Sequence, residues 1–158
     1  MSKRKCTVTE GISRYNLAAV YGDDYITERV GDDFFPPKPV KHPMVKYLSA
    51  WVDGVFSGAF MFVFQTPIDV EAHALLKRGA VKYSRELGKA AQEWVFGDER
   101  VQRLSAAVPE GLETARNYAL RMGFVEEGRK RMAHQRNGEV RDIYMLGMTR
   151  EDWRRQWA

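Results

Sequence analysis

The sequence lacks three features that would place it in a specialised class of protein. It has a single cysteine, Cys6, which excludes an internal disulfide and a multi-cysteine metal site. No apolar run approaches the ~20 residues that a membrane-spanning helix needs, and the longest apolar stretch, residues 58–64, is typical of a buried strand. No apolar signal-peptide core follows the basic residues 1–5. These absences predict a cytoplasmic protein that is not inserted in a membrane.

Charge is nearly balanced along the chain. Its 158 residues include 25 Lys and Arg against 21 Asp and Glu, a net charge of +4, which suits an anionic ligand such as CoA or an acidic protein partner. Basic residues gather in 129–136 and 150–155, but without a recognition-helix signal or interleaved exposed aromatics. We therefore expect a solvated basic face rather than a nucleic-acid site. The length predicts a single domain, as a monomer or a homodimer.

Regular structure is sparse in residues 1–45. A weak helical spacing between Gly11 and Tyr21 predicts a short helix, and the prolines between Pro36 and Pro43 forbid regular structure until about Val45. The long loop over residues 32–43 has two open interpretations. It could cover a functional site, or it could be an extended surface connection.

Residues 46–158 show the pattern of a sheet with helices. Asp53-Gly54 and Asn137-Gly138 are two-residue hairpin signals. Helices are expected over residues 78–96, 112–122 and 150–157. Strands are expected over residues 47–52, 55–64, 68–76, 101–108, 124–133 and 140–148. This order predicts an α/β (α+β) fold with a mixed, mostly antiparallel sheet.

One expected strand, residues 68–76, carries polar side chains on a single face. Asp69, Glu71 and His73 point the same way because strand side chains alternate with a period of two, while the opposite face is apolar. A carboxylate next to an imidazole could act as a general base. The alternative is a half-exposed sheet whose polar face meets solvent.

The junction that follows this strand is a candidate phosphate site. A helix N-terminus has unpaired N–H groups and a positive dipole end, so it attracts phosphate. Arg78 and Lys82 add positive charge, and Gly79 lets the backbone approach a ligand closely. Many helices begin with a basic residue and a glycine, so the pattern is weak by itself.

A run of motifs in the second half of the chain is more specific. It comprises residues 101–104, Ala115, the segment Gly123-Phe124-Val125-Glu126-Glu127-Gly128, the basic residues 129–131, Asn137-Gly138, Asp142, the apolar residues 145–148 and Glu151-Asp152-Trp153. This run resembles the GNAT N-acetyltransferases, most closely the branch that acetylates ribosomal proteins and polyamines. The whole layout is also similar to small GNAT-like proteins encoded by bacteriophages, which would act in the host cytoplasm.

The resemblance implies a GNAT acyl-CoA N-acyltransferase fold with helices on both faces of its sheet. Acetyl-CoA, as co-substrate, would lie between strands 68–76 and 101–108, and an unidentified amine would attack its thioester. Glu71 or His73 would be the base, with Tyr118 as a reserve acid. The residues implied in binding acetyl-CoA are Ala72, Ala74, Leu75, Leu76, Arg78, Gly79, Ala80, Val81, Lys82, Tyr83 and Ser84.

Three positions depart from the family pattern. Val81 replaces the second small residue of the phosphate loop, Leu112 replaces an asparagine, and Ala119 replaces the tyrosine that often protonates the CoA sulfur. These departures keep an alternative open, namely a catalytically inactive GNAT-fold protein used in binding or in virus-particle assembly. A nucleic-acid-associated role for the basic C-terminal face is a third interpretation.

Overall fold

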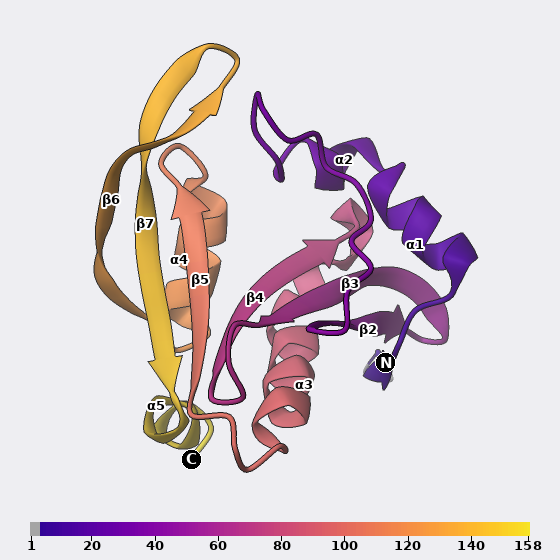
Figure 1. Ribbon diagram of the computed structural model, residues 1–158. Helices are drawn as coiled ribbons and strands as arrows, with labels where there is room; N and C mark the ends of the chain where they lie inside the picture. The colour runs from indigo at the N-terminus through magenta and orange to yellow at the C-terminus, as the bar shows by residue number, and fades with distance from the viewer. Residues whose placement is uncertain (1–3) are drawn as a thin grey trace.

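The computed structural model of the protein describes residues 4–158 and contains one seven-stranded sheet, in the order β1-β2-β3-β4-β5-β7-β6 (Figure 1). Among the strands of residues 4–158, β4 and β5 are the only parallel neighbours. The strands are β1 (Cys6–Glu10), β2 (Val45–Val52), β3 (Val55–Phe64), β4 (Asp69–Leu76), β5 (Arg103–Pro109), β6 (Val125–Arg136) and β7 (Glu139–Thr149). The helices are α1 (Arg14–Tyr21), α2 (Asp24–Thr27), the 3₁₀ helix η1 (Arg78–Tyr83), α3 (Ser84–Phe96), α4 (Glu113–Arg121) and α5 (Arg150–Gln156). The predicted mixed, mostly antiparallel α/β fold is confirmed.

Within residues 4–158, no helix combines the length and the apolar character that a membrane crossing requires.

The N-terminal region is more regular than the sequence predicted. β1 forms an antiparallel edge strand on β2, and the carboxylate of Asp53 accepts a hydrogen bond from the N–H of Lys5 at 2.8 Å. A strand of five residues, two of them exposed, has too little apolar alternation to stand out in a sequence. α2 was also missed; it begins where the side chain of Asp23 caps the N–H of Ile26. The absence of helix and strand between residues 28 and 44 confirms the proline-based prediction.

Both hairpin turns have the predicted backbone conformation. Asp53 and Gly54 have φ of 49° and 78°, and Asn137 and Gly138 have φ of 53° and 76°. Two consecutive positive φ angles define a type I′ turn, whose twist matches that of the flanking strands. The register of both hairpins is therefore fixed by these dipeptides.

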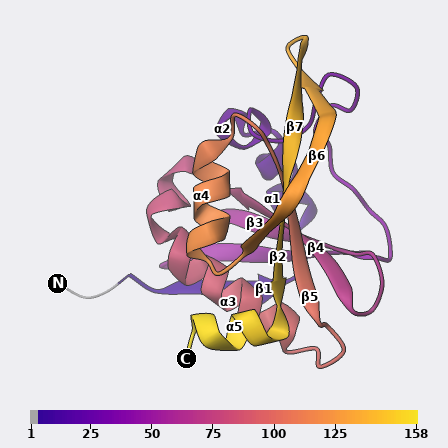
Figure 2. The ribbon, with the colours of Figure 1, turned by 90° about the vertical axis from the view of Figure 1, so that its left-hand side faces the viewer.

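Helices cover both faces of the sheet. α3 and α4 lie on one face (Figure 2), where Leu87, Ala91 and Val95 of α3 are buried against the sheet. On the opposite face, Val20 of α1 and Ile26 of α2 pack against Ala59 and Leu75, which are completely or almost completely buried. The rest of that second face has no helix over it among the described residues.

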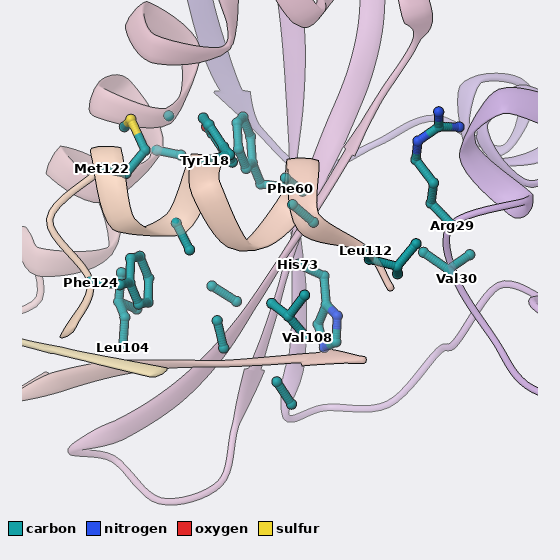
Figure 3. A pocket seen from close by; sticks show the side chains of 18 of the residues that line it. Arg29, Val30, Phe60, His73, Leu104, Val108, Leu112, Tyr118, Met122 and Phe124 are labelled. Carbon is teal, nitrogen blue, oxygen red and sulfur yellow. The ribbon is translucent and has the colours of Figure 1, made fainter. Parts of the chain in front are cut away.

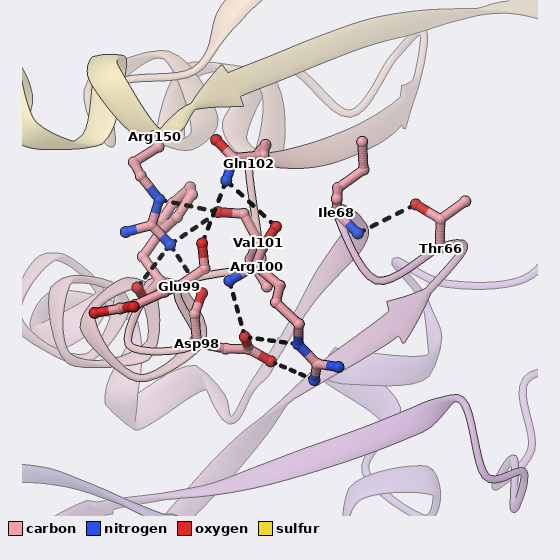
Figure 4. A network of polar contacts seen from close by, with 9 residues as sticks. Thr66, Ile68, Asp98, Glu99, Arg100, Val101, Gln102 and Arg150 are labelled. Carbon is pink, nitrogen blue, oxygen red and sulfur yellow. Dashed lines mark hydrogen bonds and ion pairs between the residues drawn. The ribbon is translucent and has the colours of Figure 1, made fainter.

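One arginine joins the end of α3 to the start of β5. The guanidinium of Arg150 donates to the carbonyl oxygens of Phe96, Asp98 and Val101 at 2.8 to 3.0 Å (Figure 4). It also lies over the ring of Phe96, which stacks on Trp153. These contacts satisfy the Phe96 carbonyl, which the end of α3 leaves unpaired, and tie the residues between α3 and β5 to the start of α5.

Candidate active site

β4 and β5 pair at their N-terminal ends and then separate. The parallel register runs only from Asp69 opposite Arg103 to Glu71 opposite Ser105, although β4 continues to Leu76 and β5 to Pro109. Figure 1 shows the two strands diverging into a V. Beyond Glu71, no described strand pairs with the β5-facing edge of β4, so its backbone N–H and C=O groups are open to a ligand or to water.

A cleft fills this V and passes through the sheet. It is lined by side chains that alternate between the two faces of the diverging strands. Ala72 and Ala74 of β4 point to the α3 side, whereas His73 points to the other side. On β5, Ala106 likewise points to the side of the helices and Ala107 to the other side. The cleft therefore connects the two faces of the sheet, and Figure 3 shows His73 among its lining side chains.

α3 and α4 form the wall of the cleft at one point of very close approach. A Cβ atom at Gly88 would lie 2.7 Å from Cε of Met122 and would overlap the hydroxyl oxygen of Tyr118. That hydroxyl donates a hydrogen bond of 2.8 Å to the carbonyl oxygen of Ser84. Burial raises the pKa of Tyr118. Tyr118 could therefore protonate a thiolate only after releasing Ser84.

Glu71 and His73 form the polar pair at the cleft. Nε2 of His73 lies 2.9 Å from Oε1 of Glu71, and Nε2 of Gln65 donates to the other carboxylate oxygen at 3.2 Å. The hydrogen bond from His73 lowers the pKa of Glu71, so the carboxylate stays ionised. An Nε2–H donated to Glu71 leaves Nδ1 of a neutral His73 as the proton acceptor.

Asp69, the third polar residue on this face, belongs to a separate network. It accepts a hydrogen bond of 3.0 Å from Ser105 and lies 3.6 Å from Arg103, which pairs with Glu127 at 2.6 Å. These contacts join β4, β5 and β6 where β4 and β5 are still paired. Asp69 therefore stabilises the base of the V.

The stretch predicted to bind phosphate is a 3₁₀ helix, η1, that leads directly into α3. Within η1, the side chain of Ala80 is buried and that of Val81 is exposed. Gly79 has open space where a side chain would stand. Neither Arg78 nor Lys82 forms an ion pair with any of residues 4–158. Their charges are thus available to an anion.

The other residues predicted to bind acetyl-CoA differ in whether their side chain or only their backbone can reach the cleft. Leu75 and Leu76 are buried on opposite faces of β4, so only their backbone can reach the cleft. Ala74 is exposed, and Tyr83 packs at the edge of the main core. Ala72 lines the cleft itself.

Sequence reasoning missed the far side of the cleft. Arg29 and Val30, from the segment after α2, stand at its mouth, and the guanidinium of Arg29 stacks on Tyr25 at 3.5 Å. A second, more polar pocket shares Pro109 and Leu112 with the cleft. Its other lining residues are Glu28, Gly31, Glu110, His134, Arg136, Asn137, Glu139 and Arg141. These residues lack a common motif, because they meet only through the tertiary fold.

Comparison with known proteins identifies the fold. No family model matches the sequence, and no curated protein matches it. A spermidine N-acetyltransferase from Vibrio cholerae, in complex with CoA and spermine, superimposes with a TM-score of 0.77 at 14% identity, over 94% of this chain and 97% of that one. A protein assigned as an acetyltransferase gives a TM-score of 0.78 at 15% identity, over 99% and 89% of the two chains. One assigned as a phosphinothricin N-acetyltransferase gives 0.73 at 16% identity, over 92% and 98%. The chain therefore has the fold of the GNAT acetyltransferases.

Proposed function

We propose that the protein transfers an acetyl group from acetyl-CoA to a primary amine. The observation that carries this proposal is the cleft that passes through the sheet between β4 and β5. A thioester entering from the α3 and α4 side would meet an amine entering from the side of His73. Such a passage holds two reactants in line, which is the main requirement of a direct transfer.

The chain offers acetyl-CoA three kinds of contact. The open backbone edge of β4 from Ala72 onward suits the amide groups of the pantetheine arm. The exposed Ala74 leaves room for that arm. Arg78 and Lys82 carry charge for the phosphates, while Val81 takes space that a smaller residue would leave open. The donors and the space fit the co-substrate, and Val81 is the residue of η1 that departs from the family pattern.

In this reaction the amine nitrogen attacks the thioester carbonyl carbon. A C–N bond forms, the C–S bond breaks, and the CoA thiolate leaves. Nδ1 of His73 accepts the proton that the nitrogen loses, and Glu71 orients the ring and stabilises its charged form. The thiolate takes a proton from solvent, because the hydroxyl of Tyr118 is bound to Ser84.

Two measurements test this function. Calorimetry with acetyl-CoA should show binding below millimolar concentration, and release of free CoA thiol in the presence of amines should report turnover. Spermidine is a first acceptor to try, because the Vibrio cholerae neighbour is described as a spermidine N-acetyltransferase. Absence of acetyl-CoA binding would contradict the proposal.

Variants of the polar pair test the assigned roles. We expect His73→Ala to lower kcat by about 10²–10⁴-fold, the usual contribution of a general base, with the affinity for acetyl-CoA unchanged. Glu71→Gln should lower kcat less and should shift the pH profile, because it removes the charge that orients His73. His42→Ala, an exposed histidine on the proline-rich loop, is the matched control.

A second candidate function is a GNAT fold used for binding or assembly without chemistry. It is favoured by Val81 in η1, by Leu112, which gives α4 no side-chain cap, and by the commitment of Tyr118 to Ser84. Its partner would be an acidic protein, in the host cytoplasm and in particle assembly if a phage encodes the chain. A stable co-purifying partner with no thioester turnover would favour this candidate.

A further inference from the structure

The segment after α2 is hydrogen-bonded to the tip of the β6–β7 hairpin, more than 100 residues away in the sequence. The carboxylate of Asp33 accepts from the N–H of Asn137 at 2.7 Å and from the N–H of Gly138 at 2.9 Å. It also accepts from the side-chain amide of Gln135 at 3.1 Å, and the N–H of Asp33 donates to the carbonyl of Gln135 at 2.9 Å. We call this set of contacts the clasp.

The clasp depends on the carboxylate of Asp33 and on the turn of the β6–β7 hairpin. The type I′ turn of Asn137 and Gly138 presents two consecutive N–H groups, and a carboxylate can accept both at once. These bonds lower the pKa of Asp33, chiefly through Gly138. Two weaker contacts flank them, from His134 to the carbonyl of Gly31 and from Arg136 to that of Thr27. These contacts hold residues 27–33 against the β6–β7 hairpin.

The clasp spans the open end of the V. Ile26 of α2 packs beside Leu75 near the C-terminal end of β4. The hairpin tip extends beyond Pro109, the last residue of β5, which pairs with Ile143 of β7. Figure 1 shows the loop after α2 approaching the hairpin above the diverging strands. The clasp therefore joins the two arms of the V on the face to which His73 points.

The second pocket lies beneath the clasp. Gly31, His134 and Asn137 line it from the clasp side, and Pro109 and Leu112 connect it to the cleft. Two of its three acidic residues, Glu110 and Glu139, form ion pairs with arginines of β6 and β7, so they act as part of the wall; the third is Glu28. The second pocket thus adjoins, at Pro109 and Leu112, the cleft that His73 lines.

We propose that Asp33 is a specificity-determining residue that closes the acceptor side into a channel and thereby selects slender, flexible primary amines. Small aliphatic amines and mobile chain ends would pass beneath the clasp. A lysine held on the surface of a folded protein would not, because its surroundings would meet the clasp first. This inference rests on the acetyltransferase function proposed above.

The test compares the same lysines in two states of one probe protein. Ribonuclease A, native or reduced and alkylated, is supplied with acetyl-CoA, and acetylation is followed by mass spectrometry, with spermidine as a small-amine probe. The wild-type protein should acetylate spermidine and the unfolded chain at least about 10-fold faster than native ribonuclease A. Asp33→Ala should reduce this ratio several-fold, and Asp33→Asn should have a smaller effect because it keeps one acceptor oxygen.

Asp53→Ala is the matched control, since Asp53 makes the same kind of carboxylate contact to backbone at the edge of the sheet, with Lys5. It should leave the ratio unchanged. Equal acetylation of native and unfolded ribonuclease A, or a ratio unaffected by Asp33→Ala, would overturn the inference and leave the acetyltransferase function standing. No acetylation of any probe would overturn both. Amide hydrogen exchange adds a readout without turnover: equally fast exchange of Asn137 and Gly138 in the wild type and in Asp33→Ala would show that no clasp forms.

Discussion

The close contact between α3 and α4 makes Gly88→Ala an informative substitution. In the interior of an exposed helix, replacing glycine by alanine raises the free energy of unfolding by about 1 kcal/mol. At Gly88 the new Cβ would overlap the Tyr118 hydroxyl and lie 2.7 Å from Cε of Met122. Overpacking of this kind costs about 1–3 kcal/mol. We therefore expect a net loss of roughly 0–2 kcal/mol, where helix propensity alone predicts a gain.

A double-mutant cycle assigns this loss to the hydroxyl. Tyr118→Phe alone should cost about 0.5–1.5 kcal/mol, because it removes the hydrogen bond to Ser84. In that background, the ring carbon Cζ of residue 118 lies 3.4 Å from the position of the new Cβ, an ordinary contact, and Met122 can move at its flexible end. Gly88→Ala should then be neutral or stabilising. The coupling energy should be on the order of 1 kcal/mol.

Urea denaturation of the four proteins in the cycle provides the measurement. Gly79→Ala is the control, because a Cβ there meets nothing within 4 Å. It should change the free energy of unfolding by less than about 0.5 kcal/mol. If Gly88→Ala instead stabilises the wild-type protein by about 1 kcal/mol, then α3 and α4 do not meet at this point and the described wall of the cleft is wrong.

Three further predictions concern the rest of the molecule. Arg150→Ala should lower the free energy of unfolding by about 2–4 kcal/mol in urea denaturation, because three backbone carbonyls lose a charged donor; a change below about 1 kcal/mol would show that water replaces it. Ala74→Leu should weaken acetyl-CoA binding in calorimetry by at least ~10-fold with little effect on stability, because the side chain is exposed in the cleft; unchanged affinity would place the ligand elsewhere. The pKa of Asp33 is lowered in the folded protein, so the clasp is fully present above the ordinary aspartate pKa and is lost as pH falls through the lowered value; amide NMR shifts of Gly138 that stay constant down to strongly acidic pH would contradict this.

The sequence predicted the elements with strong periodic or turn signals. β2, β3, β6 and β7 were located to within a few residues because Asp53-Gly54 and Asn137-Gly138 fix the hairpins between them. Local signals were too weak for β1 and α2, which depend on a long-range strand partner and on the cap from Asp23. A helix was expected over residues 78–96, and its first six residues form a 3₁₀ helix, in which a local i to i+3 bond, as from Ala80 to Lys77, satisfies the backbone.

The candidate site was only partly accessible to sequence reasoning. The period of two in β4 correctly placed Glu71 and His73 together, and the structure gives their separation as 2.9 Å. It could not reveal that Asp69 is held by Ser105, since that contact depends on the parallel pairing of β4 with β5. It also could not reveal the clasp, whose halves lie more than 100 residues apart and share no motif. Local patterns thus identified side chains that could do chemistry, and the topology decided which of them face a ligand.

The separation of β4 from β5 is itself an argument for a ligand-binding function. Leaving the edge of a central strand unpaired forgoes hydrogen bonds that a continuous sheet would make, and buried backbone groups without partners are strongly destabilising. The cleft is tolerated because small side chains, including Ala72, Ala74, Ala106 and Ala107, keep it open to water or a ligand. A module that only displayed its outer surface to a partner would have no need of a passage through its sheet. The small residues and the unpaired edge occur together where a thioester and an amine would have to meet, which favours acetyl transfer over assembly.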